Sequence, residues 1–198
     1  MLCHSVWLKL ALAAALVPVQ AASPTASNDQ GSSITVHVYK SGLFSAFAHN
    51  HVIFAPISKQ TVDAKNMNVE IVVLTKEMKV TDPEASDSTR AEIQSTMLGP
   101  KVLDVEKYPE VHFKSSSIAK IDSGRYRVIG ALELHGTSKE ISFEVSGALN
   151  HYHGSTRLKQ TEFGIQPVSI GGGTVKVRDQ IDLDFDVYSG ETANAGKH

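Results

Sequence analysis

The sequence predicts an all-β protein, an antiparallel barrel of about eight strands with one helical insertion. Apolar and polar residues alternate along many short segments, as they do on strands with one buried face and one solvated face. Turn residues separate these segments at Asp122-Ser123-Gly124 and at His135-Gly136-Thr137, where hairpins are expected. One stretch breaks the period of two and carries helix signals instead. These three features favour a curled sheet with an apolar interior and one helix.

The alternation is clearest near the C-terminal end, where the apolar set Ile181, Leu183, Phe185 and Val187 is interleaved with acidic residues. Strands are predicted at residues 33–40, 47–55, 65–74, 110–118, 125–134, 139–149, 155–165 and 179–188, with a further short one near 172–177. A barrel of about this size either fills with side chains or holds one small ligand.

The helix is predicted over residues 82–98. Asp82-Pro83 closes the preceding segment, and Thr89 with Glu92 three positions later has the spacing of a capping box. Ile93 and Met97 form an apolar stripe at i, i+4, and Gly99-Pro100 ends the pattern. We expect this helix to cover one end of the barrel.

The N-terminal residues predict export. Residues 1–21 combine Lys9, an apolar run over 10–17 and small residues at Val19 and Ala21 as a cleavage site, which is typical of a secretory signal peptide. A flexible lead-in is expected at residues 22–32, the barrel domain at 33–190 and a tail at 191–198. The apolar run is shorter than the roughly 20 residues of a membrane span, so we expect a soluble product without stable membrane insertion.

Composition excludes some functions. Cys3 is the only cysteine and lies within the predicted signal, so the mature domain is expected to have no disulfide. The formal net charge of -2 gives no reason to expect nucleic-acid binding. No catalytic motif and no cofactor-binding motif is recognised, and the triple glycine at 171–173 lacks the context of a phosphate loop.

Strand parity gives a candidate ligand-binding set on the inner face. We expect the wall to include Val69, Ile71, Val73, Val111, Phe113, Leu132, Leu134, Ile141, Phe143, Val145, Leu183 and Phe185, with Ile93 and Met97 added from the helix. At the mouth we expect Phe44, Phe47, His49 and His51. Alternation alone does not distinguish a packed core from a cavity.

Several segments carry a family resemblance. They are Leu-Asp-Val-Glu-Lys-Tyr-Pro at 103–109, Val-His-Phe-Lys-Ser at 111–115, Gly-Ala-Leu-Glu-Leu-His-Gly-Thr-Ser-Lys-Glu at 130–140 and Phe-Gly-Ile at 163–165. In these the chain resembles the YceI-like proteins. The resemblance implies a periplasmic, lipocalin-like barrel whose tunnel holds a long isoprenoid-type lipid, with the polar head near the mouth and no enzymatic activity.

Two alternatives stay open. His49 and His51 lie two apart, a workable spacing for ligands of a metal or a tetrapyrrole, with His37, His112 or His135 as a third ligand. A filled barrel serving as an interaction module is the other. Arg90 could pair with a pyrophosphate head group or simply lie at the surface. An unpaired edge strand or an exposed apolar lip could also support a homodimer.

Overall fold

The structure is a computed structural model, and it describes residues 31–41, 50–63, 66–148, 150–170 and 175–189. The strands are β1 (Ser33–Ser41), β2 (His51–Pro56), β3 (Lys59–Asp63), β4 (Asn68–Leu74), β5 (Lys79–Val80), β6 (Glu110–Asp122), β7 (Arg125–Leu134), β8 (Thr137–Ala148), β9 (His151–Lys159), β10 (Ser169–Ile170) and β11 (Val175–Tyr188). The helices are α1 (Asp87–Leu98) and the two 3-10 turns η2 (Thr75–Glu77) and η3 (Gln160–Phe163).

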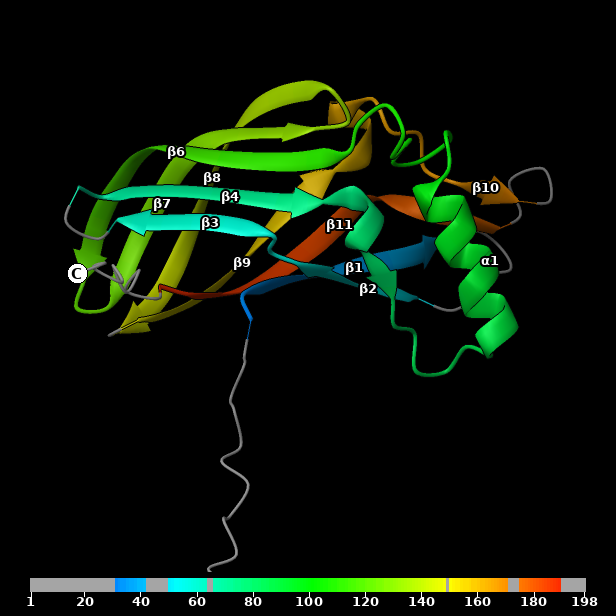
Figure 1. Ribbon diagram of the computed structural model, residues 1–198, viewed down its shortest axis with the longest axis horizontal. Coiled ribbons are helices and arrows are strands. Elements are labelled where there is room, and N and C mark those ends of the chain that lie inside the picture. Colours follow the sequence, from blue (N-terminus) through cyan, green and yellow to red (C-terminus); the bar gives the residue numbers. More distant parts are fainter. Residues whose placement is uncertain (1–30, 42–49, 64–65, 149, 171–174, 190–198) are drawn as a thin grey trace, which may run out of the picture.

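The strands form one antiparallel sheet that curls into a barrel (Figure 1). Hydrogen-bonded neighbours follow the order β3-β4-β6-β7-β8-β9-β11-β1-β2-β5, and β10 pairs with β11 outside this path. In Figure 1, β3, β4 and β6 lie above and β9, β11, β1 and β2 lie below. The predicted fold class is thereby confirmed, with eleven strands among the described residues in place of about eight.

β3, at one end of the strand path, follows β2, which is next to last at the other end, through only Ile57 and Ser58. Two backbone bonds hold this link: Ile57 N donates to Ser32 O at 3.0 Å, and Ser58 N donates to Val72 O at 2.9 Å. The upper and lower walls are therefore joined on this side by a linker that hydrogen-bonds to both.

The predicted hairpins are confirmed. Strands β7 and β8 pair up to Leu134 opposite Thr137, which leaves a turn of His135 and Gly136. Both have positive φ, 52° and 72°, as a type I′ turn requires. A Cβ at Gly136 would lie 2.6 Å from the Tyr108 ring, so both conformation and space favour glycine there.

Several predicted boundaries were wrong. The predicted strand 155–165 is β9, which begins at His151 and ends at Lys159, after which the chain turns into η3 and then Gly164 at φ 76°. The short strands β3 and β5 were missed, because Lys59–Asp63 is largely exposed and lacks apolar alternation, while Lys79–Val80 has only two residues. Parts of the predicted strands 47–55, 65–74 and 172–177 lie outside the described residues.

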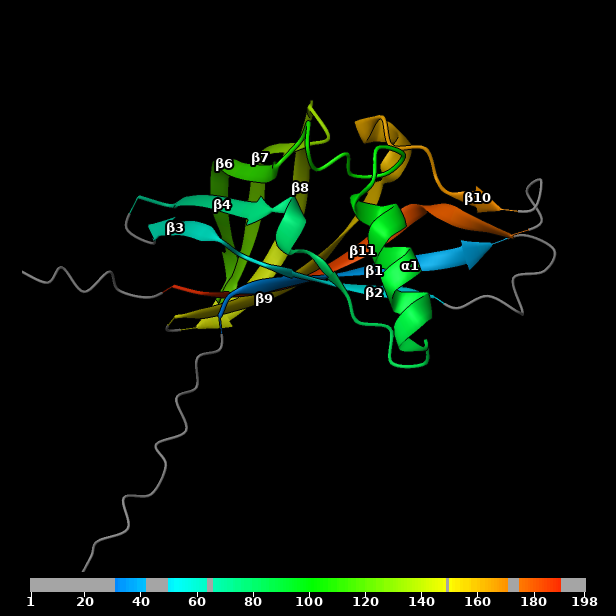
Figure 2. The same ribbon diagram turned by 45° about the vertical axis from the view of Figure 1, so that its right-hand side comes forward.

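The helix is shorter than predicted, and its N-cap is a different residue. Residues 82–86 are not helical, and α1 begins after Ser86, whose hydroxyl accepts a bond from Thr89 N at 3.2 Å. Thr89 therefore lies within the first turn and does not cap the helix, so the predicted capping box of Thr89 and Glu92 was wrong. Figure 2 shows α1 standing at one end of the barrel beside β1 and β2.

The core follows the predicted inner face. Val73, Phe113 and Leu132 of the predicted set are buried in one apolar cluster, which also contains Val36 and Val128. None of the helices in the described part of the chain is both long and apolar enough to cross a membrane.

Candidate functional site

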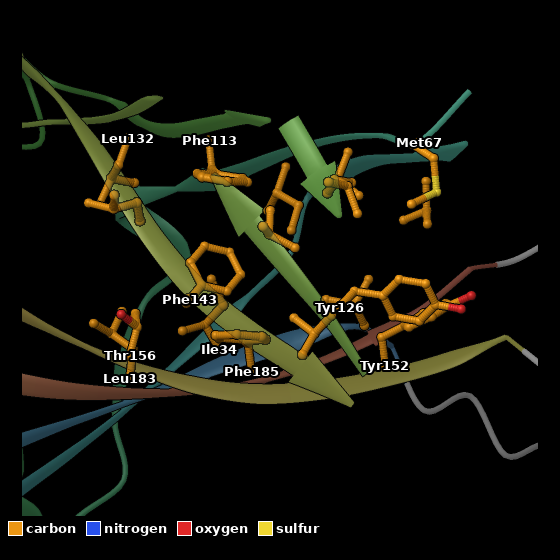
Figure 3. Close-up of a pocket in the computed structure, with 18 of the residues that line it drawn as sticks. Ile34, Met67, Phe113, Tyr126, Leu132, Phe143, Tyr152, Thr156, Leu183 and Phe185 are labelled. Carbon is orange, nitrogen blue, oxygen red and sulfur yellow. The ribbon is translucent and has the colours of Figure 1, made fainter. Parts of the chain in front are cut away.

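The interior of the barrel contains two cavities. The larger, which we call the helix-side chamber, has a volume of about 440 Å³ and is bounded by α1, β1, β2 and the η3 turn. The smaller, which we call the aromatic chamber, has a volume of about 170 Å³ and lies between β4, β6, β7 and β8 on one side and β9 and β11 on the other. Figure 3 shows side chains of the aromatic chamber converging from opposite walls.

The two chambers adjoin inside the barrel. Ile34, Leu132, Leu158 and Leu183 line both of them, and they come from four different strands. These four apolar side chains form a collar where the two chambers meet.

The structure places every described member of the predicted set on a chamber wall. The aromatic chamber is lined by Val69, Ile71, Phe113, Ile141, Phe143, Val145 and Phe185. The helix-side chamber is lined by His51, Val73, Ile93, Met97, Val111 and Leu134, while Leu132 and Leu183 line both chambers. Phe44, Phe47 and His49 lie outside the described residues. That these side chains bind a ligand stays a prediction.

Burial shows that the opposite walls do not close on one another. Ile71, Ile141, Phe143 and Leu183 point inward, yet each is only half-buried. Packed core residues of this type are usually more than nine-tenths buried. The residual exposure comes from the cavity they line, so the interior is not filled with side chains from end to end.

Sequence reasoning missed several wall residues. Ile34, Val36 and Val38 on β1 face the cavities, and their alternation with Thr35 and His37 would have found them. Tyr152 lines the aromatic chamber beside Tyr126, at a ring distance of 6.2 Å. It was missed because the predicted strand begins at residue 155, whereas β9 begins at His151.

A polar pair lies in the wall of the helix-side chamber. His51 Nδ1 lies 2.7 Å from Asp82 Oδ2, and Val52 N donates to Asp82 Oδ1 at 2.6 Å. Asp82 is 2% exposed. Because a buried carboxylate accepts a hydrogen bond from Nδ1–H, the Nε2 atom of His51 is left for another partner.

The guanidinium group of Arg90 binds neighbouring parts of the protein itself, so the structure does not support it as a head-group contact. Its Nη1 atom donates to Asp82 O at 3.0 Å and to Ala85 O at 2.6 Å, and its Nη2 atom pairs with Asp87. These bonds fasten the segment 82–87 to the first turn of α1. The arginine holds the loop that carries Asp82.

The described histidines do not gather into a metal site. His37 bonds Asp184 at 2.9 Å and His112 bonds Glu70 at 2.8 Å, both on the outer face, whereas His51 faces inward. His135 lies in the β7–β8 turn against Tyr108. Within the described ranges, no three His, Cys, Asp or Glu side chains could hold a metal ion.

These features define the class: a lipocalin-like antiparallel barrel with an apolar interior that is partly empty. A family model for the YceI-like domain matches residues 25–188. The chain belongs to the YceI-like family, and the resemblance read from its sequence is confirmed.

The individual relatives match only part of the chain, at moderate sequence identity. The chain is 33% identical over 96 residues to a UPF0312 protein of Vibrio parahaemolyticus, a match that covers 43% of this chain and 51% of that protein. A UPF0312 protein of Pseudomonas putida is 28% identical over 110 residues, covering 50% and 54% of the two chains. The chain thus spans about half the length of these curated relatives.

Solved structures support the same fold. The crystal structure of Burkholderia cenocepacia BcnA matches with a TM-score of 0.58 at 16% identity, covering 80% of this chain and 96% of that one. The Campylobacter jejuni YCEI protein matches with a TM-score of 0.52 at 14% identity, covering 67% and 81%. At these identities the likeness concerns the fold alone.

Proposed function

We propose that this protein is a periplasmic binding protein that holds a long apolar lipid of the isoprenoid type inside its barrel, and that it is not an enzyme. The observation that carries the proposal is the pair of adjoining apolar chambers within one barrel. A long hydrocarbon chain matches an elongated apolar space, and its binding requires no reactive group.

Size and lining support a hydrocarbon ligand. Small-molecule pockets are usually about 300–1,000 Å³ and mostly apolar, with a few polar groups that orient the ligand. The helix-side chamber, at about 440 Å³, lies within this range. Removing apolar surface from water contributes roughly 25 cal/mol per Å², so the hydrocarbon chain supplies most of the affinity.

The polar side chains are distributed unequally between the two chambers, and this difference would set the orientation of the ligand. His51, Glu92 and Gln160 line the helix-side chamber, together with lysines at the ends of β1, β9 and β11. In the aromatic chamber, the non-aromatic polar side chains of the wall are Asp63 and Thr156. We therefore assign the head group to the helix-side chamber, near His51 Nε2, and the tail to the aromatic chamber.

The rival functions have less support. Among the described residues, the histidines considered as third metal ligands lie on the outer face or in a turn, away from His51. A filled barrel serving only as an interaction module would not leave half-buried apolar side chains around interior cavities.

The proposed location has its own support. Residues 1–21 have the charge, apolar run and length of a secretory signal peptide. Cleavage after Ala21 during export would release the barrel domain into the periplasm, where it could carry or store a lipid.

Native mass spectrometry of protein purified without detergent tests the proposal, together with organic extraction and metal analysis. We expect a bound mass that is lost on extraction and matches an isoprenoid lipid. The same spectra report whether the protein forms a homodimer. Near-stoichiometric metal with no lipid would favour the histidine-based alternative. Protein that carries no lipid and takes up no added prenol would overturn the proposal.

A further inference from the structure

Three phenylalanine rings cross the aromatic chamber. Phe113 reaches in from β6, Phe185 from β11, and Phe143 from β8 lies between them (Figure 3). The ring centroids are 5.4 Å apart between Phe113 and Phe143, and 5.0 Å apart between Phe143 and Phe185. These separations are those of attractive aromatic pairs. The rings therefore form a continuous bridge from one wall of the aromatic chamber to the other.

The two outer rings lie directly against the walls. A Cβ built on Gly130 of β7 would come 2.7 Å from Cζ of Phe113, and a Cβ built on Gly154 of β9 would come 2.8 Å from Cζ of Phe185. Each ring thus occupies the space that a side chain would take at its neighbouring glycine. Phe113 and Phe185 are therefore packed against the backbone of the neighbouring strands.

Phe143 has a different setting. It pairs across the sheet with Val128 of β7, and its ring is not among the three nearest atoms to a Cβ built on Gly130 or on Gly154. Phe143 and Phe185 are both half-buried, whereas Phe113 is 7% exposed. Because Phe143 is the middle ring of the three, its displacement would open the space between Phe113 and Phe185, on the way from the collar to Tyr126 and Tyr152.

We propose that Phe143 determines the chain length of the lipid that the barrel accepts. This inference rests on the proposed function. A short chain is accommodated in the helix-side chamber and the collar with Phe143 in its present position. A longer chain enters the aromatic chamber only by displacing the Phe143 ring, which gives up both of its aromatic contacts. At about 170 Å³, the aromatic chamber as it stands is too small for a long tail.

The test compares binding of a short prenol, farnesol, and a long prenol, solanesol, to delipidated protein. The variants are Phe143→Ala and the milder Phe143→Leu, which keeps more of the buried volume. Phe54→Ala is the matched control, because Phe54 lies on β2, outside both chambers, and is 39% exposed. Thermal unfolding establishes that each variant folds, and Phe143→Leu carries the test if Phe143→Ala does not.

We expect Phe143→Ala to raise affinity for solanesol relative to farnesol by about tenfold, and Phe143→Leu to raise it less. Phe54→Ala should leave the ratio at its wild-type value. If both prenols bind and neither Phe143 variant changes the ratio, the length-determining role is wrong while lipid binding stands. If the wild-type protein binds neither prenol, the proposed function fails and this inference fails with it.

Discussion

Asp82 links three parts of the molecule through its two carboxylate oxygens and its carbonyl. It bonds the ring of His51 and the backbone N–H of Val52 on β2, and its carbonyl accepts from Arg90 on α1. All buried side-chain nitrogen and oxygen atoms in the described part of the chain have partners, and Asp82 is among them at 2% exposed. A buried carboxylate of this kind fixes the position of the histidine that we assign to the lipid head group.

Replacing Asp82 with alanine should lower the free energy of unfolding by about 3 kcal/mol, because it removes two hydrogen bonds to a buried charged acceptor. Urea denaturation measures the change. Asp87→Ala is the control: the Asp87 side chain is 95% exposed, and its pair with Arg90 should contribute less than about 1 kcal/mol. Equal losses in the two variants would contradict the structural role given to Asp82.

At the scale of the elements, a hydrogen bond between Ser86 and the first turn of α1 fixes the residue at which the helix begins. Ser86 adopts an extended backbone, φ -66° and ψ 161°, and its side chain accepts the bond from Thr89 N. The helix lies against the helix-side chamber through Ile93 and Met97. Where α1 begins therefore sets where its apolar stripe meets the cavity.

Ser86→Ala should lower the free energy of unfolding by about 1 kcal/mol, the usual contribution of an N-cap hydroxyl. Thermal or urea unfolding measures it. Ser95→Ala, at an exposed position in the same helix, is expected to change stability little or to raise it slightly, because alanine has the higher helix propensity. A loss in Ser95→Ala as large as in Ser86→Ala would argue against a capping role.

The η3 turn depends on Asp179. Its carboxylate accepts bonds from the backbone N–H and the hydroxyl of Thr161, each at 2.8 Å. The bond from the Thr161 backbone N–H is the largest cause that lowers the pKa of Asp179 below its usual value. The turn is thereby fastened to β11, just where β9 ends.

This lowered pKa predicts a pH dependence with a definite sign. Because the folded-state pKa lies below the unfolded value of about 3.9, the stabilisation is present above that value and is lost as pH falls through the folded pKa. The stability difference between wild type and Asp179→Asn should therefore shrink as pH falls below about 4. Urea titrations across this range measure it, and a difference that does not vary with pH would contradict the assignment.

At the scale of the whole molecule, the walls of the barrel stand apart around two chambers instead of closing into one packed core. The sheet encloses this space because it curls, and the link between β2 and β3 ties its upper wall to its lower wall on one side. A lipid in the chambers would supply apolar contacts that the walls do not make with one another. The unfolded chain has no such chambers, so lipid binding should stabilise the fold.

Saturation with a prenol should consequently raise stability. At a free concentration one hundred times its dissociation constant, a ligand that binds only the folded protein adds about 2.7 kcal/mol to the free energy of unfolding. Urea denaturation with and without farnesol measures this, and glycerol, which has hydroxyl groups but no apolar chain, serves as the control. An unchanged unfolding midpoint at saturating farnesol would count against an interior binding site.

Features of the fold that depend only on residues adjacent in the sequence could be predicted. The turn at His135-Gly136 and the alternation on β11 need only neighbouring residues, and both predictions were right. The bond between His51 and Asp82 was not predictable, because it joins residues 31 apart through the path of the loop before α1. Phe163-Gly164-Ile165 was misread as strand, because the apolar, small, apolar order fits both a strand and the 3-10 turn that Gly164 closes.

The sequence by itself determined which face of each strand is apolar, because side chains alternate across a strand with a period of two whatever lies opposite. It could not determine whether Phe143 meets the far wall, the other aromatic rings or an empty space. That depends on how strongly the sheet curls and how far apart its walls stand. Only the tertiary structure sets this distance, and with it the volume left for a ligand.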